Sequence, residues 1–257
     1  MDIDAGSLTF QLKDQNLFKQ QCFINGEWVN SDNGETFDVY NPSDLTIVGS
    51  MPNSSKSDTV KAINAANNSW TGWRKLTGKD RSIIIRKWHE LILKNIDDLA
   101  LIMTLENGKP IADSRGEIVY ASWFTDWFSE EAKRTYGKTI PSTMADRRMM
   151  SIKQPIGVCG IITPWNFPAA MITRKVAPAL AAGCPVVIKP AGSTPFSATA
   201  LVELAHRAGV PKGVINLISV SEENVAQVGD ELCTNKHVRK ISFTGSTNVG
   251  RALIAKT

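Results

Sequence analysis

The chain has 257 residues, 42% of them hydrophobic and 21% charged, and its formal net charge is +4. Because no run of lysine and arginine is longer than two residues, the excess positive charge does not indicate a nucleic-acid partner. No apolar run approaches the roughly 20 residues that a membrane span needs, so we expect no membrane partner. The first ten residues contain two acids and no arginine, unlike a signal peptide or a mitochondrial presequence, and we expect a cytoplasmic protein.

The four cysteines are scattered along the chain without C-x-x-C spacing: Cys22, Cys159, Cys184 and Cys233. This distribution is typical neither of a disulfide framework nor of a zinc site. We therefore interpret the cysteines as small apolar residues of a reduced protein and expect no metal.

Short extended segments come first along the chain. Residues 23–29 have the pattern of a β-hairpin with Asn25 and Gly26 at its turn. Residues 37–40 and 47–48 are predicted to be short strands of the same layer.

A run of predicted helices follows. The first starts near Ser57, where apolar residues begin to recur every three or four positions, and its cap is Ser55 or Ser57. A second covers residues 84–92. A third covers residues 97–107 and stops at Gly108, which precedes a lysine and a proline.

The fourth predicted helix, residues 111–136, is rich in aromatic side chains. Trp123, Phe124, Trp127 and Phe128 lie close together in it. An aromatic stripe on a helix most often belongs to the core, so we assign all four side chains to packing.

Residues 137–154 interrupt the helical pattern. This stretch is polar and has extended segments on either side of its centre. We predict a hairpin that projects from the body and holds subunits together; the alternative is an ordinary surface loop.

Strands and helices alternate after Gln154. The predicted strands are residues 157–163, 185–189, 214–218 and 239–243, and the predicted helices are residues 169–182, 196–208, 222–233 and 246–255. Short strands alternating with helices of ten or more residues predict an α/β fold with a parallel, doubly wound sheet.

Two polar residues stand at predicted strand ends. In open α/β sheets ligands bind outside the carboxyl ends of the strands, and both Asn166 and Lys189 fall there. The amide of Asn166 is a neutral donor suited to a developing oxyanion, although an asparagine that stabilises a turn is an equally good interpretation. Lys189 is suited to a ribose or phosphate oxygen, and the alternative is a surface lysine with a buried stem.

A glycine turn follows the last predicted strand. Gly245 and Gly250 have the spacing G-x-x-x-x-G at a strand-to-helix junction, where backbone N–H groups hold phosphates. The motif is not a P-loop, because Arg251 and Ala252 replace the lysine and hydroxyl residue that such a loop needs. A purely structural turn is the alternative.

One helical face after Asn166 combines apolar and cationic residues. Phe167, Met171 and Arg174 lie at i, i+4 and i+7. An apolar wall that ends in a guanidinium suits a short aliphatic substrate with a carboxylate at its far end. The alternative is that Arg174 pairs with a nearby acidic side chain.

In combination, these motifs resemble the aldehyde dehydrogenase superfamily. The resemblance is carried by P-W-N-F-P at 164–168, K-P at 189–190 and F-T-G-S-T-x-x-G at 243–250. The stretch 162–175 is most similar to succinate-semialdehyde dehydrogenases. The resemblance implies a Rossmann-like fold and the oxidation of succinate semialdehyde, or a similar carboxylated aldehyde, to the acid with NAD or NADP. It also implies a homodimer or homotetramer.

The resemblance further implies a domain division and a set of site residues. Residues 1–136 form the N-terminal part of the cofactor-binding domain, 137–154 a bridging hairpin and 155–257 the dinucleotide-binding units. Asn166 is implied as the oxyanion donor, with Phe167, Met171 and Arg174 binding substrate. The implied cofactor residues are Thr163, Pro164, Trp165, Lys189, Pro190, Ala191, Gly192, Ser193, Gly229, Phe243, Gly245, Ser246, Thr247, Asn248, Val249 and Gly250.

Gly192 departs from many NAD-preferring members, which carry a glutamate after K-P-A. That glutamate repels the 2′-phosphate of NADP, so its absence leads us to expect that NADP is accepted. Lys189 and Ser193 are expected to favour the extra phosphate.

The family's general-base glutamate and nucleophilic cysteine follow the last glycine motif, beyond Thr257. We therefore expect the catalytic domain to be absent, and the chain to be inactive alone and poorly soluble. The rival interpretation is a non-catalytic nucleotide-binding module that joins oligomers. Within the enzyme interpretation, betaine aldehyde or general aliphatic aldehydes remain alternative substrates.

Overall fold

The computed structural model describes residues 12–257. Its centre is a six-stranded sheet in the order β10-β7-β8-β9-β1-β2. The parallel strands are β7 (Val158–Ile162), β8 (Val186–Lys189), β9 (Ile215–Leu217) and β10 (Val238–Phe243), and the hairpin strands β1 (Cys22–Ile24) and β2 (Glu27–Val29) run antiparallel at the far edge.

The parallel strands confirm the predicted α/β fold. Every residue of β7, β8 and β9 is buried, because helices cover both faces of the sheet. The β1–β2 hairpin turns at Asn25 and Gly26, whose φ angles of 54° and 83° are those of a tight hairpin turn.

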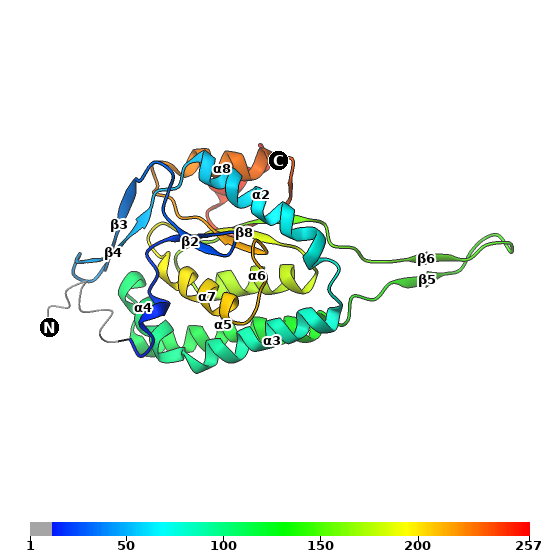
Figure 1. Cartoon of the computed structure of the whole chain (residues 1–257), viewed down its shortest axis with the longest axis horizontal. Coiled ribbons are helices and arrows are strands. Elements are labelled where there is room, and N and C mark those ends of the chain that lie inside the picture. The colour runs from blue at the N-terminus through cyan, green and yellow to red at the C-terminus, as the bar shows by residue number, and fades with distance from the viewer. Residues whose placement is uncertain (1–11) are drawn as a thin grey trace.

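Two helical layers flank the sheet (Figure 1). On one side lie α2 (Lys56–Trp73) and α8 (Val225–Thr234), and on the other lie α6 (Ala170–Ala181) and α7 (Phe196–Arg207). An outer layer of α3 (Gly78–Lys94), α4 (Ile96–Asn107) and α5 (Ile111–Glu131) packs beneath α6 and α7. The chain also contains the short 3-10 helix η1 (Gln15–Leu17) and, after β10, the final helix α9 (Thr247–Ile254).

Local signals explain where the N-terminal helices begin and end. Ser55 and Asp58 form a reciprocal capping box at the start of α2, so Ser55 and not Ser57 is the cap. Helix α4 ends at Gly108, whose φ of 81° is a left-handed conformation that favours glycine.

The strands β3 (Thr36–Tyr40) and β4 (Ile47–Pro52) form a separate two-stranded sheet, so their prediction as part of the β1–β2 layer was wrong. The reason is packing. At Gly49, a Cβ would lie 2.9 Å from the Phe196 ring and 3.1 Å from the Phe18 ring, so β4 lies against the start of α7.

The assignment of all four aromatic side chains of α5 to the core was also wrong. Trp123 and Trp127 are 61% and 65% exposed, while Phe124 and Phe128 pack against the core. Residues four apart share a helix face, and one residue of offset turns a side chain by about 100°, so the two pairs point in different directions.

The strands β5 (Lys138–Ile140) and β6 (Met149–Ser151) form a hairpin that projects from the body (Figure 1). All residues of both strands are exposed.

None of the helices within residues 12–257 is both long and apolar enough to cross a membrane. The same residues contain no group of three or more histidine, cysteine, aspartate or glutamate side chains placed to hold a metal ion.

Glu106, on α4, is 2% exposed and accepts hydrogen bonds from the backbone N–H groups of Phe196 (2.6 Å) and Ser197 (2.8 Å) at the start of α7. Burial raises its pKa to about 8. In the folded chain the Glu106 carboxyl group therefore keeps its proton up to about pH 8, whereas in the unfolded chain it loses the proton near pH 4.5, its ordinary pKa.

We expect this proton to make stability depend on pH. The free energy of unfolding should fall by roughly 2–4 kcal/mol as the pH rises from about 5 to about 8, because the unfolded state binds fewer protons over that range. Urea denaturation at several pH values measures the slope. The Glu106→Gln variant is neutral throughout, so its slope should be smaller, and equal slopes would contradict the assignment.

Candidate functional site

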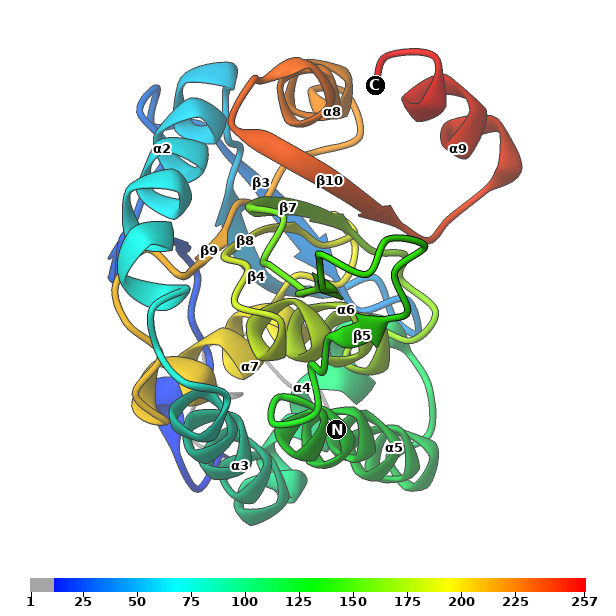
Figure 2. The ribbon, with the colours of Figure 1, turned by 90° about the vertical axis from the view of Figure 1, so that its right-hand side faces the viewer.

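A cleft of about 560 Å³ lies at the carboxyl ends of β7, β8 and β10. Helices α8 and α9 stand beside it, and Figure 2 shows both next to β10. The position is that of a ligand crevice in an open α/β sheet, because helices and loops diverge where the strands end.

Most of the predicted cofactor residues line this cleft. Those that do are Thr163, Pro164, Trp165, Lys189, Ala191, Gly192, Ser193, Gly229, Phe243, Gly245, Ser246 and Val249. Pro190, Thr247, Asn248 and Gly250 do not line it.

The cleft also contains residues that sequence reasoning missed. They are Ile162, Val220, Ser221, Glu222, Val225, Ala226, Asp230, Thr244, Ala252, Leu253 and Lys256. Residues 220–222 follow β9 closely, so the rule that ligands bind beyond strand ends was a usable signal for them. The residues of α8 and α9 carry no motif that would have marked them.

Lys189 ends β8 and is only 7% exposed. Burial lowers its pKa to about 8, and the nearby carboxylate of Glu222 partly opposes this shift. At this low exposure Lys189 does not fit the alternative of a surface lysine with only its stem buried. The charged form of a largely desolvated amine at the wall of a cleft is stabilised by an anionic ligand, because the ligand replaces the hydration that the amine has lost.

Ser221 supplies a second polar group that lacks a partner. Its hydroxyl oxygen is buried without a hydrogen bond to any described residue, and the residue lines the cleft. Buried hydroxyls are ordinarily satisfied, so an unsatisfied one in a cleft is suited to a polar ligand.

The glycine turn brings the start of α9 to the cleft. Ser246 caps the helix, and its hydroxyl accepts from the Val249 N–H at 3.3 Å. A Cβ at Gly245 would lie 2.6 Å from the Phe243 ring, and one at Gly250 would lie 3.2 Å from it. The glycine spacing therefore has a structural role, because it makes room for Phe243 beneath the helix.

Asn166 is exposed in the turn between β7 and α6. The Lys109 ammonium group donates to its backbone carbonyl at 3.0 Å, and the Asn107 amide donates to the carbonyl of Trp165 at 2.7 Å. The turn is therefore held by side chains from the α4–α5 connection.

The three residues of the predicted substrate face lie in sequence along α6 and the turn before it. Phe167 precedes the helix and is 42% exposed, and its carbonyl accepts from the Met171 N–H at 3.0 Å. Arg174 lies over the Phe124 ring, 5.3 Å from its centre, and its Nη1 is 3.9 Å from the Met171 sulfur. Among the described residues no carboxylate forms an ion pair with Arg174, so the pairing alternative is not met.

Arg174 also lines a different cavity, of about 450 Å³, together with Lys175 and Lys240. Phe167 and Met171 line neither this cavity nor the cleft. The structure thus places the guanidinium on the α6 side of the sheet, apart from the cleft.

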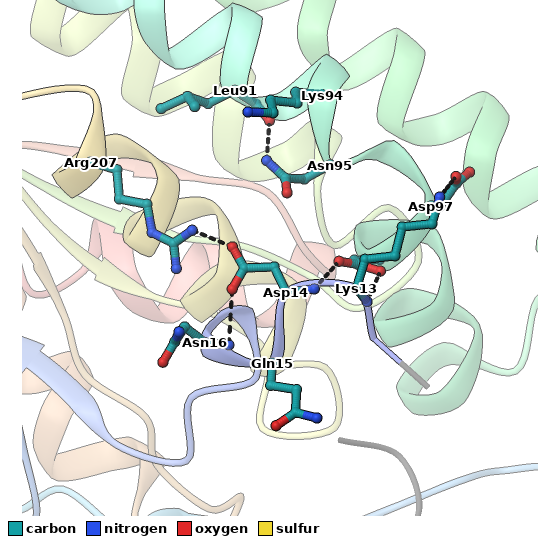
Figure 3. Close-up of a pocket in the computed structure, with 10 residues that line it drawn as sticks. Lys13, Asp14, Gln15, Asn16, Leu91, Lys94, Asn95, Asp97 and Arg207 are labelled. Atoms are coloured by element: carbon teal, nitrogen blue, oxygen red, sulfur yellow. Dashed lines mark hydrogen bonds and ion pairs between the residues drawn. The ribbon is translucent and has the colours of Figure 1, made fainter. Parts of the chain in front are cut away.

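Another cavity, of about 500 Å³, lies between η1, α3, α4 and α7 (Figure 3). Asp14 pairs with Arg207, which lowers the pKa of the carboxyl group. Asp98 accepts from the backbone N–H groups of Lys13 and Asp14 at 2.9 and 2.8 Å. These charges satisfy one another and fasten the segment around η1, so we do not assign a ligand to this cavity.

Comparison with known proteins places this geometry in a family. Residues 28–257 match the aldehyde dehydrogenase family. The chain is 57% identical over 244 residues to the NADP(+) succinate-semialdehyde dehydrogenase GabD of Escherichia coli, covering 95% of this chain and 50% of that protein. It is 56% identical over 244 residues to the glutarate-semialdehyde dehydrogenase of Pseudomonas putida, with the same coverage.

Comparison with solved structures supports the same family. The crystal structure of an Escherichia coli NADP-dependent enzyme superposes with a TM-score of 0.94 at 56% identity, covering 96% of this chain and 50% of that one. The betaine aldehyde dehydrogenase of Staphylococcus aureus in complex with NAD+ superposes with a TM-score of 0.92 at 32% identity, covering 98% of this chain and 49% of that one. The chain thus spans about half the length of the relatives it matches, and its predicted fold and family are confirmed. It belongs to the aldehyde dehydrogenase family.

Proposed function

We propose that the chain binds NADP or NAD in the cleft and contributes to the oxidation of a small carboxylated aldehyde, such as succinate semialdehyde, to its acid. The observation that carries the proposal is Lys189, a buried amine at the end of β8 that lines the cleft together with Ser221, whose hydroxyl has no partner among the described residues. Both groups are suited to the ribose and phosphate oxygens of a dinucleotide. When bound, the dinucleotide supplies the acceptor for a hydride.

Each proposed residue has a distinct role. Lys189 donates to the adenosine ribose or its 2′-phosphate, and the turn at Gly245 and Ser246 lies under the pyrophosphate. The amide of Asn166 donates to the oxygen that becomes negative when a nucleophile attacks the aldehyde carbon. Arg174, which lacks a carboxylate partner among the described residues, binds the substrate carboxylate.

We assign neither the thiol nucleophile nor the general base to residues of this chain. Cys159 and Cys184 are 4% and 3% exposed and lie at the opposite ends of β7 and β8 from the cleft residues. Covalent aldehyde oxidation needs both groups, so we propose that turnover requires a further segment of the enzyme.

We also propose a cytoplasmic homodimer or homotetramer in which the β5–β6 hairpin joins subunits. A two-stranded hairpin is marginally stable alone in water, and its Ile140, Met149 and Met150 side chains are 42%, 40% and 75% exposed. A second copy of the chain would cover them.

Titration calorimetry with NADP and NAD tests the binding proposal. Stabilising binding of either dinucleotide supports a working cofactor cleft, whereas no binding to a folded chain would overturn it. Binding without aldehyde oxidation by any form of the protein would favour a non-catalytic module.

Gly192 offers a sharper test of which dinucleotide fits. We expect Gly192→Glu to weaken NADP binding roughly thirtyfold, about 2 kcal/mol, and to affect NAD less, because the new carboxylate repels the 2′-phosphate. A Cβ here would lie 3.0 Å from the Val220 carbonyl oxygen, so any side chain brings some strain. The Gly192→Gln variant has that strain without the charge. Equal losses of NADP affinity in the two variants would count against the electrostatic explanation.

A further inference from the structure

Side chains at the connection between α4 and α5 donate hydrogen bonds to the turn that carries Asn166. We call residues 106–117 the elbow. Within it, Lys109 donates to the Asn166 carbonyl at 3.0 Å and Asn107 donates to the Trp165 carbonyl at 2.7 Å. The carbonyl groups on both sides of the Asn166 Cα are therefore fixed by elbow side chains.

Glu117 holds the other end of the same turn. One of its carboxylate oxygens accepts from the backbone N–H groups of Ala169 and Ala170, at 2.9 and 3.2 Å, where α6 begins. A carboxylate at a helix N-terminus is also stabilised by the helix dipole. Its second oxygen pairs with the Lys109 ammonium group, so the two ends of the turn are tied to one ion pair.

The Lys109–Glu117 pair is nearly buried. The side chains are 16% and 2% exposed. The Lys109 ammonium group also lies over the Phe167 ring, 4.7 Å from its centre. Such a pair has few alternative arrangements, because each group has lost water and has protein partners in several directions.

The elbow itself is fixed by its backbone. Gly108 has a φ of 81°, and a Cβ at this position would lie 2.6 Å from Pro42. At the start of the elbow, Glu106 caps α7 through the N–H groups of Phe196 and Ser197, just after the loop that carries Gly192. One short segment thus anchors the loops that follow both β7 and β8.

We infer that Lys109 and Glu117 are positioning residues that aim the Asn166 amide at the reacting oxygen. The inference rests on the proposed function of Asn166. Fixing both neighbouring carbonyls and the start of α6 sets the direction of the Asn166 Cα–Cβ bond. A donor stabilises an oxyanion only when its geometry is already correct, and a displacement of about 1 Å costs up to a hundredfold in rate.

Amide hydrogen exchange in the chain itself tests the structural half. Lys109→Met should speed exchange at Ala169 and Ala170 at least about tenfold and leave α8 unchanged. Lys87 is exposed on α3, and Lys87→Met is the matched control. Because Lys109→Met leaves Glu117 buried without its partner, a variant that combines it with Glu117→Gln removes both charges and provides a second test if the single variant folds poorly.

A double-mutant cycle tests the functional half, on the enzyme expressed from its complete reading frame. We expect Asn166→Ala to lower kcat about a hundredfold and Lys109→Met about tenfold, with KM for the dinucleotide little changed. The combined variant should be no slower than Asn166→Ala alone, because Lys109 acts through Asn166. A merely structural role of Lys109 would instead give additive losses.

The outcomes separate the two claims. Normal turnover by Asn166→Ala would overturn the proposed role of Asn166, whatever Lys109 does. A slow Asn166→Ala variant with an additive or absent effect of Lys109→Met would overturn the positioning inference alone. Unchanged hydrogen exchange at Ala169 and Ala170 in Lys109→Met would also overturn it.

Discussion

Replacing Trp88 by alanine should lower the free energy of unfolding by about 4 kcal/mol. The side chain is 1% exposed and is among the largest that are fully buried. Its indole N–H donates to the Leu201 carbonyl at 3.0 Å, which joins α3 to α7. The substitution therefore opens a large cavity and leaves a buried carbonyl with one partner fewer.

Trp123 provides the matched control. It is also a helical tryptophan, but it is 61% exposed on α5. Trp123→Ala should change the free energy of unfolding by less than about 0.5 kcal/mol, as surface substitutions usually do. Chemical denaturation of both variants measures the difference. Comparable losses would mean that the outer face of α5 is covered in solution.

The second large effect is expected at Lys189. Lys189→Met should weaken NADP binding roughly a hundredfold, about 2.7 kcal/mol, because the proposed contact between this buried cation and the 2′-phosphate is lost. NAD lacks that phosphate, so its affinity should fall less. Lys87→Met, which changes an exposed lysine on α3, should leave both affinities unchanged.

The pKa of Lys189 gives this prediction a pH dependence. Since the pKa is about 8, the free chain loses the ammonium charge as the pH rises through that value. NADP affinity of the unchanged chain should therefore fall between about pH 7 and 9, while Lys189→Met shows no such fall. Calorimetric titrations across this range make the measurement, and parallel profiles for the two proteins would refute the role.

The α/β core could be predicted from the sequence because of the periodicity of its apolar residues. Apolar runs of strand length alternate with helical patterns from residue 155 on, and this order leaves few topologies. The sequence did not predict which sheet β3 and β4 belong to, because a strand's own pattern shows that one face is buried but not which sheet the strand joins.

For a similar reason, only some residues of the candidate site could be predicted from the sequence. Lys189 and Gly245 were marked by local motifs at strand ends. Glu222 and Lys256 were not, because their neighbours in space come from other elements. The elbow was missed as well, since Lys109 and Asn166 are 57 residues apart and no local pattern couples them.

The final helix has a consequence for how a ligand would enter. No residue of α9 is buried, and one of its few ties to α8 is an ion pair between Lys256, two residues after the end of α9, and Asp230. A segment with so little buried surface opens at low free-energy cost while the rest of the domain stays folded. We therefore expect α9, which forms one wall of the cleft, to become more ordered when a dinucleotide binds there. On this expectation part of the binding free energy is consumed in ordering α9, so linking α9 more firmly to α8 should tighten binding without adding any contact to the ligand.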